Sequence, residues 1–299
     1  RNFLLRAGAV TTVGIAGAGC ADESETTDST AKIEEAQEYL NEAAEMLDEE
    51  TEELDQFNPD RVTRRTDSAR EELSAAREGA SDAELGIIRD LELIADALDA
   101  YAMLFESFTE FFNDLDTIDA LISADRFDDA ADEVETASER IEDIQANVEG
   151  ITDTYGQIDP DTYDEFDELS QADMEDWASE MDELLESLTL LLDAFGLMIP
   201  GMSTFIEGTD EWEAEHWDRA AVRFEDAAEE FDASASILED GEDDAPRGLR
   251  SEFIEMRCLM ESLRDASEHY ADAMDHAANE RWEEAEEAIS DGERALDRC

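Results

Sequence analysis

A stripe of apolar and small residues at helical spacing recurs four times along the chain, and this recurrence limits the possible folds more than any other feature. In the clearest copy Trp217 stands at position zero, and the residues at +3, +7, +10 and +14 lie on the same face of an α-helix. Four copies of one helical face predict one mode of helix packing that is used repeatedly. The copies are Ile33, Ala36, Leu40, Ala43 and Leu47; Phe127, Ala130, Val134, Ala137 and Ile141; Trp217, Ala220, Phe224, Ala227 and Phe231; and Trp282, Ala285, Ile289, Gly292 and Leu296.

Helix-breaking and capping residues divide the rest of the chain into further helices. Asn58-Pro59 ends the first helix, because proline disfavours helical backbone in the residue before it. Ser81 and Glu84 form a capping box, and we expect Thr209 to cap the helix that holds the Trp217 copy. The expected helices cover about 31–56, 61–79, 82–123, 127–150, 171–206, 209–240, 249–276 and 282–299.

No segment shows a convincing strand period, so the sequence predicts an all-α fold made of antiparallel helical hairpins. The turn residues Asp159-Pro160-Asp161 mark the clearest internal boundary. They divide an N-terminal helical region, 31–157, from a C-terminal helical region, 158–299, although the two could form one continuous domain. An apolar run at 184–206 could cross a membrane, but it contains Asp193 and Pro200, which favour a buried and kinked core helix.

The charge of the chain is extreme. Acidic residues number 87 against 20 basic ones, which gives a formal net charge of −67 at pH 7. Such a chain repels itself in dilute buffer and is expected to need molar salt, which screens charges to about 3 Å. Nineteen of the basic residues are arginine and only Lys32 is lysine. The acids are spread along the chain and are not gathered at one end, which argues against an acidic tail or a nucleic-acid mimic, and the charge disfavours nucleic-acid binding. This composition resembles that of haloarchaeal proteins.

The first thirty residues look like a processing segment followed by a tether. Arg1–Arg6 is basic at both ends, residues 7–19 form a short apolar run rich in small residues, and Cys20 follows. This order resembles a twin-arginine lipoprotein signal, in which the cysteine is lipidated and becomes the mature N-terminus. The resemblance implies a signal peptide at 1–19, lipidation of Cys20 and a flexible acidic tether at 20–30. A cleaved secretory signal or an uncleaved anchor helix remains the alternative.

The repeated stripe resembles the second helix of a tetratricopeptide repeat. In that family, small residues at +3 and +10 allow the preceding helix to approach closely. Ala130, Ala220 and Ala285 occupy the first small position here. The copies begin at 33, 127, 217 and 282, so they are far more widely spaced than the family's repeat, and no regular array of about 34 residues is expected. Heptad packing in an ordinary bundle explains the stripe equally well. In both cases we expect the aromatic residue at position zero to belong to the core.

Two of the three cysteines are expected to form a disulfide. If the last hairpin turns near Ala278-Asn279, residues whose numbers sum to about 557 lie opposite each other across the two helices, and 258 + 299 = 557. Outside the cytoplasm, Cys258 and Cys299 would therefore pair and stabilise the fold by roughly 4 kcal/mol on the chain-entropy model. Two unpaired thiols are the alternative.

Residues that could carry chemistry are few. His269, Asp272 and His276 share one helical face and are weak candidates for metal ligands. The sequence contains no phosphate-binding glycine loop, no nucleophile elbow and no zinc-type cluster, so it predicts neither an enzyme nor a cofactor.

These observations together predict a function in binding. We expect a lipid-anchored, all-helical scaffold on the extracytoplasmic face of the membrane of a halophilic archaeon, which binds an envelope protein through its hairpins. The alternative is an extracytoplasmic receptor for a solute or a metal, with a pocket near the Trp217 and Trp282 hairpins.

Overall fold

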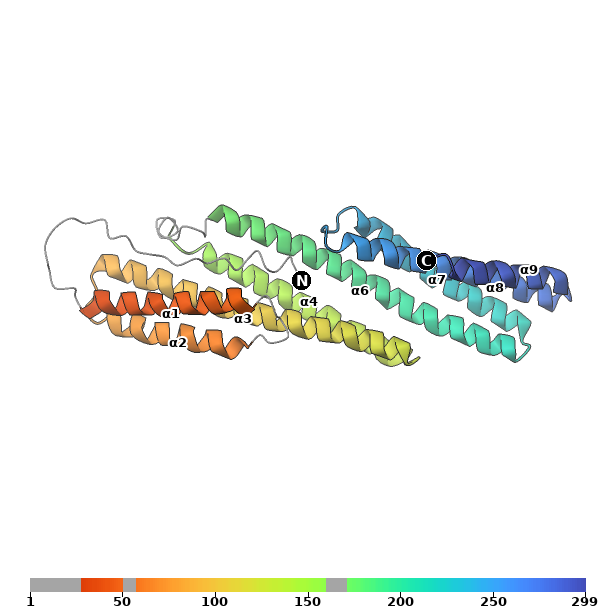
Figure 1. The fold of residues 1–299 in the computed structure, drawn as a ribbon, viewed down its shortest axis with the longest axis horizontal. Coiled ribbons are helices and arrows are strands. Elements are labelled where there is room, and N and C mark those ends of the chain that lie inside the picture. Colours follow the sequence, from red (N-terminus) through yellow and green to blue (C-terminus); the bar gives the residue numbers. More distant parts are fainter. Residues whose placement is uncertain (1–27, 51–57, 160–170) are drawn as a thin grey trace. The chain divides into compact units, whose positions relative to one another are not determined.

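The structure is a computed structural model that describes residues 28–50, 58–159 and 171–299. Helices occupy most of these residues and no strand occurs among them, so the predicted all-α fold is confirmed (Figure 1). The helices are α1 (Asp28–Glu50), α2 (Pro59–Ala76), α3 (Asp82–Ser123), α4 (Phe127–Tyr155), α6 (Gln171–Glu213), α7 (Trp217–Glu242), α8 (Arg250–Ala278) and α9 (Trp282–Leu296).

The chain forms two compact units that alternate along the sequence. Unit 1 draws on residues up to Glu110 and on Glu142–Asp182, and unit 2 on Phe111–Ile141 and Glu183–Cys299. The long helices α3, α4 and α6 each contribute residues to both units. The boundary expected after residue 157 falls inside the Glu142–Asp182 part of unit 1.

In unit 1, polar side chains join α2 to α3 around a buried apolar stripe. Val62, Ala69 and Leu73 are buried on the inner face of α2. Beside them Arg70 lies 2.7 Å from both Asp96 and Asp99 of α3. Asp99 also accepts a hydrogen bond of 2.5 Å from the Thr66 hydroxyl. Guanidinium and carboxylate groups therefore flank the α2–α3 contact.

The capping box expected at the start of α3 is present, whereas the Asn58-Pro59 pair lies at the start of α2. The Ser81 amide donates to the Glu84 carboxylate at 2.7 Å and the Glu84 amide donates to the Ser81 hydroxyl at 3.4 Å, so the capping box is confirmed. Asn58 caps α2, because its side chain accepts from the Asp60 amide at 3.1 Å, and Pro59 is the first helical residue. The Asn-Pro pair therefore begins a helix.

In unit 2, phenylalanine rings pack into notches left by glycines where α6 meets α7. A Cβ atom on Gly201 would lie 2.8 Å from the Phe231 ring, and one on Gly208 would lie 3.0 Å from the Phe224 ring. The two glycines and the two phenylalanines are each seven residues apart, in opposite order, which fixes an antiparallel register. The Ser234 hydroxyl also donates to the Ala194 carbonyl at 2.9 Å.

An aromatic cluster forms the centre of unit 2. The Phe224 ring lies 5.3 Å from Phe205, 6.5 Å from Trp212 and 5.5 Å from Tyr270, measured between centroids. These residues come from α6, α7 and α8, and Gly292 of α9 approaches the Tyr270 ring closely. Edge-to-face and tilted pairs at such distances add to the burial of the rings.

The course of α6 corrects one sequence expectation. Thr209 lies inside α6, where its hydroxyl donates to the Phe205 carbonyl at 3.2 Å, so it does not cap the next helix. Pro200 is accommodated within the same helix. Residues 176–213 are the one described segment long and apolar enough to cross a membrane, and 28% of its apolar window is buried. Part of this helix packs against α7, where Gly201 and Gly208 lie beside the Phe231 and Phe224 rings.

Candidate binding surface

The repeated stripe faces the interior in all four copies, whereas burial of its first position differs between the copies. Residues at +3, +7 and +10 are buried, except Ile289, which is partly buried. At position zero, Ile33 is 5% and Phe127 9% exposed, whereas Trp282 is 53% exposed. The expectation that the aromatic residue at this position belongs to the core is therefore wrong for Trp282.

Three of the copies begin with the same helix–helix turn. Two residues before position zero the backbone adopts a left-handed conformation, and the next amide donates to the carbonyl five residues earlier at 2.9 or 3.0 Å. This is the hydrogen bond of a Schellman-type helix end. The left-handed residues are Asp125, Glu215 and Glu280, with φ of 56, 59 and 57°. An acidic residue thus stands where glycine is usual, so the sequence held no obvious signal for this turn.

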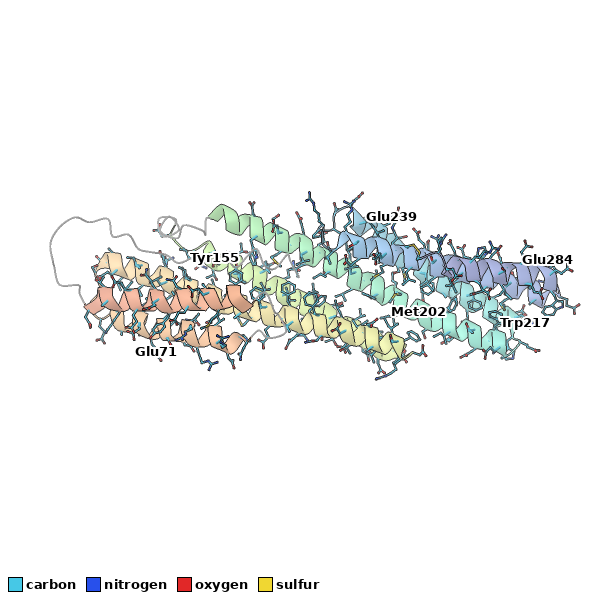
Figure 2. All side chains as sticks on the ribbon, in the orientation of Figure 1. Glu71, Tyr155, Met202, Trp217, Glu239 and Glu284 are labelled. Carbon is cyan, nitrogen blue, oxygen red and sulfur yellow. A yellow bond between two sulfur atoms is a disulfide. The ribbon has the colours of Figure 1, made fainter. Side chains whose placement is uncertain are left out.

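The last two of these turns bring their tryptophans together. Trp217 and Trp282 open α7 and α9, and their ring centroids lie 6.0 Å apart at an interplanar angle of 77°. In Figure 2, Trp217 and Glu284 mark this end of unit 2. Trp217 packs against the aromatic cluster. We call the pair and its two turns, residues 211–219 and 280–284, the tryptophan tip.

A charged cluster joins the end of α6 to the start of α7 within the tryptophan tip. The Glu211 carboxylate lies 2.6 Å from Nδ1 of His216 and 3.1 Å from the Arg219 guanidinium. His216 is the residue before α7, and its carbonyl accepts the Ala220 amide at 3.0 Å. The side chains of His216 and Arg219 are therefore already paired with Glu211.

Two carboxylate-lined clefts run along α7. One, of about 340 Å³, lies between α6 and α7 and includes Thr204, Arg223 and Glu230. The other, of about 620 Å³, lies between α7 and α8 and includes Glu225 and Arg264. Glu229 lines both. The sequence analysis did not single out these residues, because acids at helical spacing occur throughout the chain.

Glu230 has an unusual electrostatic position in the smaller cleft. Burial raises the pKa of this carboxyl above its ordinary value, and the charge of Asp226 raises it further, while a hydrogen bond with Thr204 acts in the opposite direction. Its Oε2 atom is buried without a hydrogen-bond partner. Added positive charge in this cleft would therefore be favourable.

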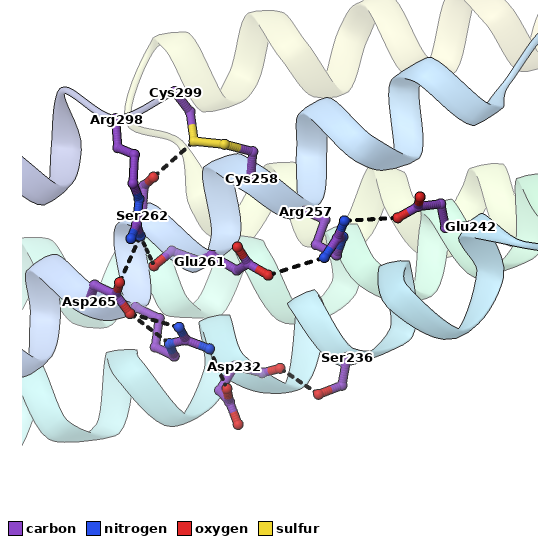
Figure 3. A network of polar contacts seen from close by, with 11 residues as sticks. Asp232, Ser236, Glu242, Arg257, Cys258, Glu261, Ser262, Asp265, Arg298 and Cys299 are labelled. Atoms are coloured by element: carbon purple, nitrogen blue, oxygen red, sulfur yellow. Dashed lines mark hydrogen bonds and ion pairs between the residues drawn. A yellow bond between two sulfur atoms is a disulfide. The ribbon is translucent and has the colours of Figure 1, made fainter.

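A polar network on α8 connects α7, α8 and the C-terminus (Figure 3). Arg264 lies 3.0 Å from Asp232 of α7 and 2.7 Å from Asp265. Arg298 lies 2.7 Å from Asp265 and donates to the Glu261 carbonyl at 3.3 Å. Burial pushes the pKa of Asp265 upward, but the hydrogen bonds and charges of Arg264 and Arg298 outweigh it, so the pKa is lowered. Asp265 thus anchors the residues that follow α9.

The predicted disulfide joins Cys258 to Cys299, with Cα atoms 6.0 Å apart. The α8–α9 turn covers residues 279–281, close to the expected turn at Ala278-Asn279. The Ser262 hydroxyl lies 3.0 Å from the Cys299 sulfur. The disulfide closes a separation of 41 residues that contains most of α8 and all of α9.

The weak metal candidates do not gather into a site. His269, Asp272 and His276 all lie on α8, and Asp272 lines the larger cleft. No group of three or more His, Cys, Asp or Glu side chains within the described ranges could hold a metal ion.

Other predictions fall partly or wholly outside the described residues. The signal peptide and Cys20 lie outside them. The last three residues of the expected tether, 28–30, belong to α1, and the Thr30 hydroxyl donates to Glu84 of α3 at 3.0 Å. No protein-family model, curated protein or solved structure matches this chain.

Proposed function

We propose that this protein is a binding scaffold that engages a partner protein through the outer surface of α7–α9 in unit 2. The observation that carries the proposal is the exposed Trp282, which contacts the partly buried Trp217, together with carboxylate-lined clefts along α7. Trp282 is 53% exposed although unit 2 has its own buried aromatic cluster. Exposed aromatic residues beside polar groups are typical of protein interfaces.

The lining of the clefts favours a protein partner over a small solute. Sites for small molecules are mostly apolar cavities with a few convergent polar groups. The larger cleft is lined by five carboxylates, one arginine and two alanines, Glu225, Glu229, Asp232, Glu268, Asp272, Arg264, Ala228 and Ala271. An open, acidic lining of this kind suits basic side chains presented from another surface.

The proposed location is the extracytoplasmic face of the membrane, with lipid at Cys20 as the anchor and the haloarchaeal cell envelope as the setting. This part of the proposal rests on the order of residues 1–20 and on the acidic, arginine-dominated composition. A disulfide between Cys258 and Cys299 fits an oxidising compartment. A Cys20→Ser variant should leave the membrane fraction, and full retention there would contradict the anchor.

Crosslinking mass spectrometry on native membranes in molar salt tests the scaffold function. We expect reproducible crosslinks between α7–α9 and one partner. Replacing Glu225 and Glu229 with glutamine should reduce them, since both line the larger cleft. Glutamine at the exposed Glu135 and Glu139 of α4 makes the same charge change elsewhere and should leave the crosslinks intact. Absence of a partner, together with a thermal shift induced by a solute or metal, would instead favour a receptor.

A further inference from the structure

Trp282 departs from the other copies of the stripe in a way that the fold does not require. Its side chain is 53% exposed, whereas Phe127 at the same position is 9% exposed. Trp282 does not belong to the central aromatic cluster of unit 2. It contacts Trp217, which packs against the edge of that cluster. A tryptophan that is 53% exposed leaves aromatic surface accessible to another group.

The charges around this ring select the kind of group that it can receive. The tryptophan tip contains seven acidic residues against two arginines, Arg219 and Arg281. Arg219 is held by Glu211 at 3.1 Å. A positively charged group is therefore complementary both to the surrounding carboxylates and to the negative face of an indole ring.

We propose that Trp282 and Trp217 form a platform for an arginine side chain on an extended basic segment of the partner protein. This inference rests on the scaffold function proposed above and names the chemistry that the scaffold recognises. The guanidinium stacks on the exposed indole, and its N–H groups donate to the neighbouring carboxylates.

Molar salt is the reason for choosing arginine over lysine. At 1 M salt the screening length is about 3 Å, so attraction across longer distances contributes little. Stacking contacts at van der Waals distance are not screened in this way. The planar, weakly hydrated guanidinium stacks on an aromatic ring more favourably than an ammonium group does. A second copy of this chain is disfavoured as the occupant, since it would oppose one acidic tip with another.

The acidic track along α7 extends the platform and favours a segment over a single ion. From Trp217 to Asp232 the helix rises about 22 Å at 1.5 Å per residue. An extended chain of about seven residues covers that length. Beyond the platform, its basic side chains would meet Glu225 and Glu229, which line the larger cleft between α7 and α8.

Titration of the full chain with defined peptides in molar salt tests the platform. The probes are peptides of about nine residues in which arginine alternates with serine, and matched peptides with lysine or with the neutral citrulline. We expect the order arginine, lysine, citrulline from strongest to weakest binding. Trp282→Ala should weaken arginine-peptide binding about two- to fivefold, and Trp282→Phe should weaken it less.

A matched variant separates the platform from general effects. Leu259 of α8 is 46% exposed, and it lies about 28 Å along the helix from the α8–α9 turn. Leu259→Ala should leave peptide binding unchanged, and thermal melting should show that each variant is folded. Equal affinity of wild type and Trp282→Ala for the arginine peptide would overturn the inference.

Three further outcomes also decide whether the platform exists. A dimer of the wild-type chain that becomes a monomer in Trp282→Ala would assign the tip to a second copy and overturn the arginine platform. A crosslinked partner combined with no preference for arginine would overturn the platform and leave the scaffold function standing. Arginine-selective binding lost in Trp282→Ala, with no crosslinked partner, would support the platform and count against the scaffold.

Discussion

The two units of this protein build similar helical contacts from different side chains. In unit 1, Arg70 and the carboxylates of Asp96 and Asp99 join α2 to α3. In unit 2, Phe224 and Phe231 fill glycine notches in α6. Near-surface ion pairs contribute little and are screened by salt, whereas a buried ring contributes several kcal/mol that salt does not weaken. The comparison indicates that the α6–α7 contact depends more on packing than the α2–α3 contact does.

Removing a ring from unit 2 should have the largest effect. Phe224 is fully buried and touches three other aromatic rings. Phe224→Ala should lower the free energy of unfolding by about 3–5 kcal/mol, because it leaves a cavity in the cluster. Hydrogen exchange should accelerate in α7 and remain unchanged in α2. Val222→Ala, at a side chain 52% exposed on the same helix, is the control and should cost less than about 0.5 kcal/mol.

Loss of the disulfide should have the next largest effect and should also be confined to unit 2. Changing both Cys258 and Cys299 to serine should cost roughly 2–4 kcal/mol, since it frees the unfolded chain from a closed loop. Hydrogen exchange should show faster opening of α9. Reduction of the wild-type protein should reproduce the effect, and an unchanged melting temperature in both cases would contradict it.

Breaking the ion pairs of unit 1 should cost less and should depend on salt. The Arg70 side chain is 31% exposed, and its partners Asp96 and Asp99 are 59% and 19% exposed. Arg70→Met should cost about 1 kcal/mol at 1 M salt and less at higher salt. Arg70→Lys keeps the charge, and its free energy of unfolding should lie between those of the wild type and Arg70→Met. A cost as large as that of Phe224→Ala would remove the contrast between the units.

The smallest expected effect is a pH dependence from Asp265. Its pKa in the folded protein lies below the ordinary value of 3.8, so its contribution is present above that pH and is lost as the pH falls through the folded value. In Asp265→Asn the melting temperature should therefore decline less steeply below pH 3.8 than in the wild type. The corresponding difference in the free energy of unfolding should be less than about 1 kcal/mol. Glu230, with its raised pKa, acts in the opposite direction. An unchanged slope would show that Asp265 does not contribute.

The sequence could predict the features that depend on local spacing. Helical periodicity identified the buried positions of the stripe, such as Ala220 and Ala130, because a residue three or seven positions along a helix returns to the same face. The capping box of Ser81 and Glu84 was readable for the same local reason. Antiparallel register was enough to pair Cys258 with Cys299, since one short turn sets which residues lie opposite.

Tertiary structure decided which members of these patterns are covered and which remain exposed. Trp217 and Trp282 occupy equivalent positions in the sequence, yet only Trp217 packs against the aromatic cluster. Exposure depends on neighbouring helices from distant parts of the chain, and periodicity carries no information about them. Tertiary structure likewise decided which carboxylates have a special electrostatic position. Burial and facing partners distinguish Glu230 and Asp265 from the many acids that the sequence presents alike.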